Sequence, residues 1–211
     1  MLKEIAEELT EKARNLEIEM RELVGEPFNP LSAKQVQHIL YEKLGLAPGK
    51  KIKTGFSVDS ETLEELGKTC EIANMILTYR GYEKLRGTYA DGLQKEINPI
   101  TKRIHTTYRE TVASTGRLSS DNPNLQNIPM GDGYAARIKA AFRPESPDEV
   151  FVVADYSQVE LRILAMLSGD EHLIEAFETG EDIHMRTARF LFPNGEDISS
   201  EQRRVAKSVN F

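Results

Sequence analysis

The 211 residues suffice for a hydrophobic core and one or two domains, and 39% hydrophobic with 29% charged residues is typical of a soluble globular protein. No apolar run reaches membrane-spanning length and no signal-peptide pattern opens the chain, so a membrane partner is not expected. The single cysteine, Cys70, excludes an intrachain disulfide framework and a cysteine-based zinc site, and indicates a reducing cytoplasm.

The net charge of -7 is unevenly distributed along the chain. Residues 101–143 carry 7 Lys and Arg against 3 Asp and Glu, a balance of +4, whereas residues 144–211 carry 6 against 14, a balance of -8. A basic middle segment can bind a polyanion locally while the whole chain stays acidic. A chance fluctuation explains the charge pattern equally well.

Apolar spacing predicts that residues 1–100 form a helical module. Apolar residues recur every three or four positions from Leu2 to Leu23, and Gly25 ends this first helix. Further helices are expected after the capping box Ser32–Gln35, after the cap at Asp59 or Ser60, and from Ile72 to Leu85. The second is lined by Val36, Ile39, Leu40 and Leu44 and stopped by Gly45. Nothing in this module indicates catalysis.

A change of pattern follows at residue 101. Segments 103–108 and 111–113 are rich in β-branched residues and predict two short strands, with a turn at Arg109 and Glu110. Residues 114–129 are dense in Asn, Ser, Gly and Pro, which predicts a loop. These side chains suit contacts to sugars, phosphates and base edges, but composition alone fits a polar surface loop as well.

An apolar run, 150–154, predicts a short strand buried on both faces, and Asp155 follows at its end. Ser157 and Glu160 have the spacing of a capping box for a helix that ends at Gly169. Asp155 would therefore occupy a strand-to-helix corner. Two interpretations remain open: a residue that starts a turn, or a metal-binding carboxylate on a rigid element.

Three capped helices are expected at the end of the chain. Asp170 and Asp182 each stand before an apolar-periodic stretch, and Ser199 with Gln202 makes a capping box for a final helix, 201–211. On that helix Arg203, Lys207 and Phe211 are spaced by four and share one side. Two cations and an aromatic ring suit a ligand with phosphates and a ring, although an exposed basic face with Phe211 in the core is also consistent.

Four stretches together resemble the family A DNA polymerases. Residues 155–162 (DYSQVELR) resemble motif A, residues 115–129 resemble the TGRLSS…PNLQNIP stretch, and residues 203–211 resemble the start of motif B on the fingers helix. Residues 84–89 are similar to the end of the thumb. The resemblance covers the chain in the family's order. It implies an α+β fold with a helical thumb (1–100), a partial antiparallel palm (101–168) and partial helical fingers (169–211).

The resemblance also implies a reaction, template-directed transfer of a deoxynucleotide from a dNTP to a primer 3′-hydroxyl. Two Mg²⁺ ions, roughly 4 Å apart, would activate the hydroxyl and hold the leaving group. Asp155 would be the catalytic metal-binding carboxylate, with the Tyr156 carbonyl as a further ligand. Positions implied for the nucleotide are Arg203 and Lys207 at the triphosphate, His184 at the phosphates, Glu160 beneath the sugar where it excludes a 2′-hydroxyl, Phe211 near the base and sugar, and Gln158. Positions implied for the primer–template are Arg117, Asn124, Gln126, Asn127, Lys84 and Arg86.

Two departures from the family pattern limit these expectations. Gly131 stands where the family usually has Arg, which puts one duplex contact in doubt. The chain also ends inside motif B, so the second metal-binding Asp is expected in a missing C-terminal palm and fingers segment. The fragment is therefore expected to be inactive alone, in a bacterial cytoplasm near the nucleoid or, for a viral protein, in a host cytoplasm. Alternatives are a non-catalytic primer–template-binding protein and one subunit of a split polymerase.

Overall fold

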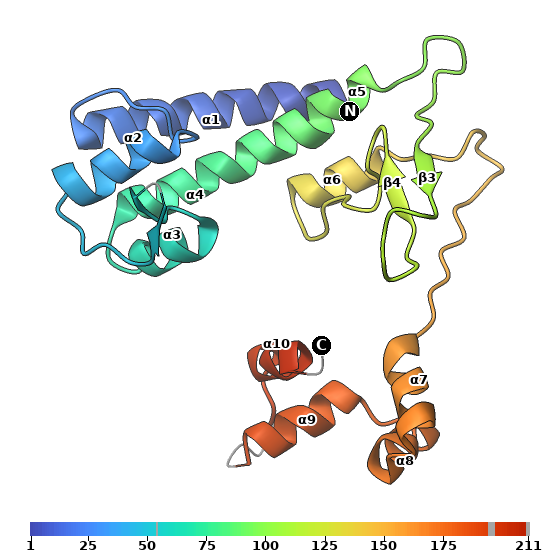
Figure 1. Ribbon diagram of the computed structural model, residues 1–211. Helices are drawn as coiled ribbons and strands as arrows, with labels where there is room; N and C mark the ends of the chain where they lie inside the picture. The colour runs from blue at the N-terminus through green and yellow to red at the C-terminus, as the bar shows by residue number, and fades with distance from the viewer. Residues whose placement is uncertain (54, 194–196, 210–211) are drawn as a thin grey trace. The chain divides into compact units, whose positions relative to one another are not determined.

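The computed structural model describes residues 1–53, 55–193 and 197–209. It is mostly helical with two small antiparallel sheets, which confirms the predicted α+β class (Figure 1). The chain divides into two compact units, Met1–Glu149 and Val150–Phe211, called the first and second units below. No described helix is long and apolar enough to cross a membrane.

The first unit contains most of the regular structure. Its elements are α1 (Leu2–Val24), α2 (Ala33–Gln37), the π-helix η1 (His38–Lys43), β1 (Lys51–Ile52), β2 (Gly55–Phe56), α3 (Ser60–Gly67), α4 (Glu71–Lys84), the π-helix η2 (Leu85–Ala90), α5 (Asp91–Lys95), β3 (Thr107–Arg109), β4 (Ser119–Asp121) and α6 (Tyr134–Ala140). α4, η2 and α5 follow one another without a break. The expected helix after Ser32 is thus an α-helix continued by a π-helix, and Leu44 lies exposed at its end.

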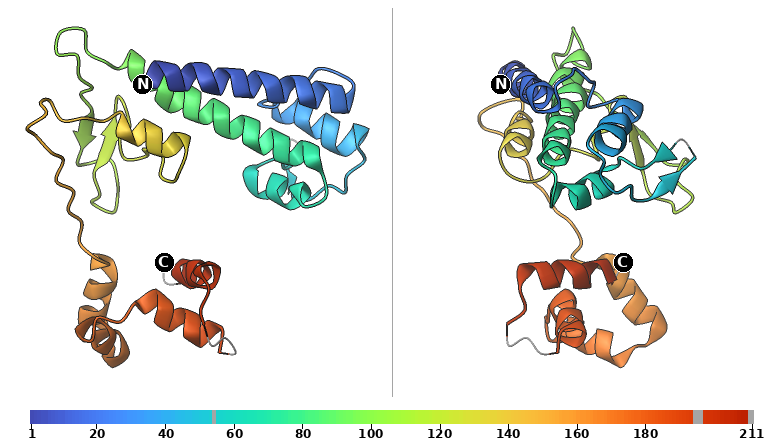
Figure 2. Two further views of the ribbon diagram at one scale, coloured as in Figure 1. Left: turned by 180° about the vertical axis from the view of Figure 1, so that it is seen from behind. Right: turned by 90° about the vertical axis from the view of Figure 1, so that its left-hand side faces the viewer.

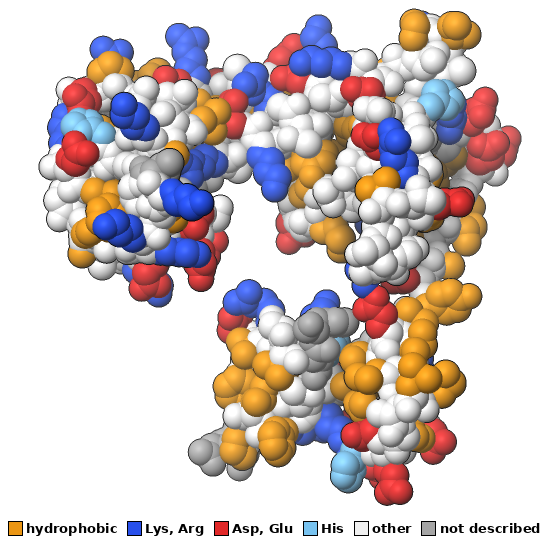
Figure 3. All heavy atoms as spheres, viewed as in Figure 1, with side chains coloured by type: hydrophobic (Ala, Val, Ile, Leu, Met, Phe, Trp, Pro, Cys, Tyr) orange, Lys and Arg blue, Asp and Glu red, His pale blue; other side chains and the backbone are white. Residues whose placement is uncertain are grey.

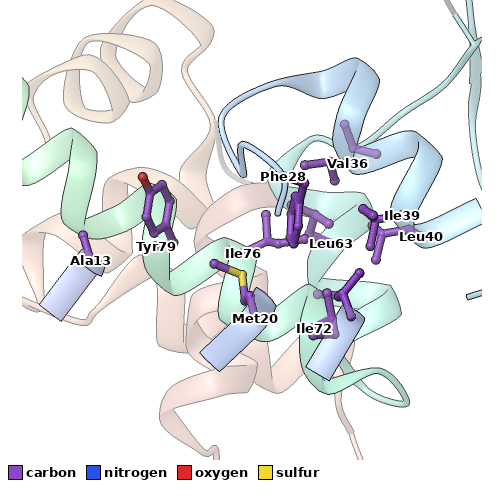
Figure 4. Close-up of a cluster of buried hydrophobic side chains, with 13 residues drawn as sticks. Ala13, Met20, Phe28, Val36, Ile39, Leu40, Leu63, Ile72, Ile76 and Tyr79 are labelled. Carbon is purple, nitrogen blue, oxygen red and sulfur yellow. The ribbon is translucent and has the colours of Figure 1, made fainter. Parts of the chain in front are cut away.

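Helices α1 and α4 lie side by side and carry the main core of the first unit (Figure 2). α1 ends as predicted at Gly25, whose left-handed backbone (φ 81°) directs its N–H to the Arg21 carbonyl. The apolar faces of α1, α3, α4 and η1 meet around Met20, Ile39, Leu63 and Ile76, all buried (Figure 4). Because these faces close on one another, the helical module buries its own apolar stripes.

A second buried cluster joins the amino-terminal half of α1 to η2, α5 and α6. Ile5 and Leu9 of α1 pack with Tyr89, Leu93 and Ile138. Polar contacts reinforce the same junction, because the Glu8 carboxylate accepts two hydrogen bonds from Arg137, at 2.6 and 2.7 Å. α6, which follows the polar loop, is therefore fixed on α1.

The predicted pairing of strands 103–108 and 111–113 is wrong. β3 pairs instead with β4, in the register Thr107 with Asp121 and Arg109 with Ser119, and no strand forms at 111–113. The Thr106 hydroxyl lies 2.7 Å from that of Ser120 and hydrogen bonds the Asp121 carbonyl. These side-chain contacts hold the polar loop against β3, so the partner of β3 begins eight residues further along the chain than the local pattern suggests.

The predicted strand at 150–154 is also wrong, because these residues have no regular secondary structure. Their apolar side chains are exposed: Val150 79%, Phe151 61%, Val152 87% and Val153 91%. No strand within the described ranges pairs with this segment, and a strand without a partner gains neither ladder hydrogen bonds nor burial. Asp155 consequently lies on an irregular stretch rather than on a rigid corner.

The second unit contains four helices in its described part: α7 (Val159–Ser168), α8 (Glu171–Glu178), α9 (Ile183–Leu191) and α10 (Ser200–Val209). The N-cap of α7 is Gln158 and not Ser157 as predicted. Gln158 has a left-handed backbone (φ 53°) and makes no side-chain capping bond. The caps predicted for α8, α9 and α10 do form. A small buried cluster of Leu161, Ala176 and Ile183 joins α7, α8 and α9.

Candidate functional site

The beginning of α9, with its cap Asp182 and with His184, lies beside α10, which carries Arg203 and, in its last turn, Lys207. These four residues are here called the α9–α10 cluster. α9 and α10 pack together within the second unit (Figure 2). Asp182 Oδ1 accepts the backbone N–H groups of His184 (2.9 Å) and Met185 (3.2 Å) and so caps α9. Its Oδ2 accepts Nε (3.0 Å) and Nη2 (2.7 Å) of Arg203. One carboxylate therefore caps one helix and holds a cation of the next.

The electrostatics of the cluster follow from these contacts. Burial acts to raise the pKa of Asp182, but the bonds from Arg203, Met185 and His184 outweigh it and leave the pKa below its ordinary value. His184 is buried, which lowers its pKa, and the charges of Arg203 and Lys207 lower it further against the opposing effect of Asp182. The imidazole is therefore neutral at pH 7, while Asp182 is ionised.

Three predicted nucleotide-contacting positions, His184, Arg203 and Lys207, thus lie on neighbouring helices. Arg203 and Lys207 are one turn apart on α10, as the spacing of four predicted. Phe211, the third member of that stripe, lies outside the described residues. Two cations and a neutral imidazole make a group suited to an anionic ligand.

Asp155 and Tyr156, the predicted metal ligands, are both exposed at the end of the irregular segment. Among residues 1–53, 55–193 and 197–209, no group of three or more His, Cys, Asp or Glu side chains is arranged to hold a metal ion. Mg²⁺ in phosphate chemistry takes one or two carboxylates together with substrate phosphates and water. The Asp155 carboxylate and the Tyr156 carbonyl could supply some of the ligands of such a magnesium site, but not all of them. Gln158 and Glu160 follow at the start of α7, and Glu160 is exposed.

The polar loop of the first unit is braced by its own side chains. Gln126 donates from Nε2 to the Leu118 carbonyl (2.8 Å) and accepts with Oε1 from the Ser120 amide (3.3 Å). Asn124 Oδ1 accepts the Gln126 amide at 2.9 Å. Two of the predicted DNA-contacting side chains thus also shape the loop, which fixes its position before any ligand arrives.

A cleft of about 680 Å³ lies between this loop and the end of α4. Its lining includes the predicted DNA-contacting residues Lys84, Asn124 and Asn127. The Tyr89 hydroxyl donates to the Asn127 carbonyl and so joins η2 to the loop across the cleft floor. The structure therefore places the Lys84 side chain and the side chains of Asn124 and Asn127 at the lining of the same cleft.

Arg86, in contrast, is not a lining residue of this cleft. Its Nη2 bonds Glu83 at 2.6 Å, its Nη1 lies 3.6 Å from Asp91, and the carboxylates raise its pKa. Arg117 is exposed on the loop, before β4. The predicted DNA-contacting residues are thus gathered in part, and Arg86 is engaged with its own helix.

Sequence reasoning missed the second role of Asp182 and the pairing of Glu8 with Arg137. The sequence indicated that Asp182 caps a helix, but no pattern indicated that the guanidinium of Arg203, 21 residues later, would be its partner. The bond from Arg137 lowers the pKa of Glu8 to about 2 against some desolvation, with help from the Tyr134 hydroxyl and from Lys12. Such pairs depend on how helices pack, so spacing along the chain cannot reveal them.

Comparison with known proteins gives one consistent result. The model of DNA polymerase family A matches residues 1–211. DNA polymerase I of Geobacillus stearothermophilus is 45% identical, and that of Bacillus subtilis (strain 168) 46% identical, each over 211 residues. Both alignments cover 100% of this chain and 24% of the relative, so the chain spans about a quarter of the length of these relatives.

A solved structure agrees with this result. The polymerase domain of Pol1 from M. smegmatis, in complex with DNA primer-template and dNTP, superposes with a TM-score of 0.87 at 36% identity, over 100% of this chain and 37% of that one. The resemblance of the motifs, the fold and the match along the whole chain thus lead to one family. The chain belongs to DNA polymerase family A.

Proposed function

We propose that this chain supplies the thumb, part of the palm and the start of the fingers of an enzyme that copies a DNA template by adding deoxynucleotides to a primer 3′-hydroxyl. The observation that carries the proposal is the α9–α10 cluster, where His184, Arg203 and Lys207 meet as an anion-binding group. A dNTP triphosphate is the anion that the family relationship indicates. The thumb, palm and fingers ranges 1–100, 101–168 and 169–211 are part of this proposal.

The residues of the second unit would act as follows. Arg203 donates a hydrogen bond to the triphosphate, and Lys207 supplies a point charge beside it. His184, kept neutral by burial, donates one hydrogen bond without adding charge. Glu160 packs beneath the sugar and excludes a 2′-hydroxyl, with Gln158 beside it and Phe211 near the base.

Asp155 and the Tyr156 carbonyl would hold the metal. Two Mg²⁺ ions would supply activation of the 3′-hydroxyl and stabilisation of the pyrophosphate leaving group. Asp155 would be one carboxylate of this site, and the described residues contain no group of three or more His, Cys, Asp or Glu side chains that could hold a metal ion. We therefore propose that the second carboxylate belongs to a C-terminal palm and fingers segment, and that residues 1–211 alone do not polymerise.

The cleft in the first unit is the proposed contact for the primer–template. Lys84 would contact a phosphate, while Asn124, Asn127 and the exposed Arg117 would contact backbone and base edges near the newest pair. Gln126 would act from the braced loop. Arg86 would contribute only after exchanging Glu83 for a phosphate. The relatives named above are bacterial, which favours a site beside the nucleoid in a bacterial cytoplasm over the viral alternative.

Primer extension tests this proposal directly. Residues 1–211 are assayed alone and mixed with the C-terminal remainder of the Bacillus subtilis relative, each with and without Asp155→Ala. Extension only in the mixture, abolished by Asp155→Ala, is expected. Extension by residues 1–211 alone that is sensitive to Asp155→Ala contradicts the incomplete metal site.

A second candidate is a protein that binds primer–template without catalysis, alone or as one subunit of a split polymerase. It is favoured by the cleft with Lys84, Asn124 and Asn127, because this cleft lies within the first unit, which has cores of its own. Fluorescence anisotropy with a labelled primer–template distinguishes the candidates. Binding without extension in any mixture supports this second function.

A further inference from the structure

We infer that Asp182 is a positioning residue that fixes Arg203 and His184 as one phosphate-binding group. This inference rests on the proposed function of the α9–α10 cluster and names a residue outside the predicted set. Asp182 itself would not touch the phosphates. Its effect would pass through the Arg203 side chain and through the first turn of α9, which carries His184.

Both carboxylate oxygens of Asp182 are in use, and each has a separate task. Oδ1 holds the first turn of α9, which carries His184, through the amides of His184 and Met185. Oδ2 holds Arg203 of α10 through Nε and Nη2. A single side chain therefore fixes the register between two helices, each of which supplies one member of the phosphate-binding group.

The geometry leaves one edge of the guanidinium for a ligand. Asp182 occupies Nε and Nη2 of Arg203, and Nη1 has no hydrogen-bond partner within the described part of the chain. An Arg side chain that is free to move loses rotamer entropy when a ligand immobilises it. Since Asp182 already orders Arg203 in the folded protein, a phosphate that meets Nη1 would not lose that entropy on binding.

The negative charge of Asp182 is the argument against this role, since a carboxylate repels phosphate. Four donors compensate that charge: two backbone amides and two guanidinium nitrogens. The remaining cation, Lys207, lies one turn further along α10. Ordering should therefore outweigh repulsion, so removing the charge should weaken phosphate binding.

Asp182→Asn separates the two tasks. Asn is a good N-cap, so α9 keeps its first turn. With the amide oxygen at the Oδ1 position of the cap, however, an NH2 group replaces Oδ2, and this donor cannot accept hydrogen bonds from Arg203. Asp170→Asn is the matched control, because Asp170 caps α8 in the same way, with Oδ1 accepting the Leu173 amide at 2.9 Å, and the charge change is identical.

The experiment uses the whole 1–211 chain with inorganic tripolyphosphate as the probe, at one ionic strength. NMR follows the His184 imidazole signals during titration, and hydrogen exchange follows the amides of α10. Asp182→Asn should raise the Kd about tenfold and speed exchange in α10. Asp170→Asn should change neither quantity.

Unchanged or tighter tripolyphosphate binding by Asp182→Asn overturns the inference, because charge alone would then govern the site. Unchanged exchange in α10 overturns it as well. If the unsubstituted chain binds no tripolyphosphate, the proposed nucleotide site fails. The positioning of α10 by Asp182 is still decided in that case, since faster exchange in Asp182→Asn supports it.

Discussion

The two units differ in how completely they bury their apolar residues. In the first unit, two clusters built from α1, α3, α4, η1, η2, α5 and α6 enclose the apolar faces. In the second unit, Leu161, Ala176 and Ile183 make the buried cluster, while residues 150–153 and one side of α7 remain exposed. Figure 3 shows apolar side chains exposed along the irregular segment and α7.

The contrast between the two units lies in which apolar faces have a packing partner. In the first unit, α1 packs against α4 and α6, which lie far along the chain, whereas the helices described in the second unit pack mainly against their neighbours in the sequence. In the second unit, residues 150–153 and one side of α7 expose apolar side chains, and no described residue packs over them to bury them. Contiguous exposed apolar surface of this kind marks a site of contact with another chain segment or an aggregation hazard.

The largest expected effect is the loss of core packing in the first unit. Ile76→Ala should lower the free energy of unfolding by about 2–5 kcal/mol, because Ile76 is fully buried between α4 and its neighbours. Leu164→Ala on the exposed side of α7 should change it by about 0.5 kcal/mol or less. Urea unfolding followed by circular dichroism measures both, and equal losses would remove the contrast between the units.

The exposed segment should govern self-association of the chain. Val152→Lys should reduce binding of a hydrophobic dye and the fraction of aggregate in size-exclusion chromatography, because it places a charge in the apolar patch. Val112→Lys, at an exposed position of the first unit outside that patch, is the control. A similar reduction of dye binding and aggregate by both substitutions would mean that net charge, and not the apolar patch, controls association.

A smaller effect should appear at the junction of α1 and α6 at low pH. The pKa of Glu8 is about 2 instead of the ordinary 4.5, so its contribution to stability is complete above pH 4.5 and is lost as the pH falls toward 2. Glu8→Gln should remove this part of the pH dependence, whereas Glu11→Gln, one turn away on α1, should retain it. Thermal unfolding between pH 2 and 6 provides the comparison.

The smallest effect concerns His184 in the second unit. Its pKa lies below the ordinary 6.5, so below pH 6.5 the unfolded chain binds a proton that the folded chain does not. The second unit should therefore lose stability as the pH falls from 7 through the folded pKa. An NMR titration of the imidazole measures that pKa, and a value at or above 6.5 contradicts the buried neutral state.

The sequence predicted most helix ends because caps are local. Gly25 ends α1, and Asp59, Asp170 and Asp182 cap α3, α8 and α9 through contacts that span three residues or fewer. Strands failed for the opposite reason. Residues 111–113 and 150–154 have the composition of strands, but a strand exists only with a partner, and composition does not name one.

The same distinction applies to the candidate site, where residue identities could be predicted but contacts between distant residues could not. Motif resemblance indicated His184, Arg203 and Asp155 from residue identities alone. It did not indicate that Asp182 joins the first two, or that Arg86 is engaged by Glu83 and Asp91, since both facts depend on packing between or along helices. The family supplied the roles, and the fold supplies the contacts between the residues that would perform them.

The π-helix η2 sets the rotational phase of everything that follows it in the continuous run from α4 to α5. Ile76 and Tyr79 of α4 face the first cluster, whereas Tyr89 and Leu93 face the second. η2 begins between these two groups, and its wide turn changes the rotational phase of the residues that follow it. Deleting a single residue here would rotate α5 by about 100° about the axis, since an α-helix has 3.6 residues per turn. The length of this run is therefore under tighter constraint than the identity of most of its exposed side chains.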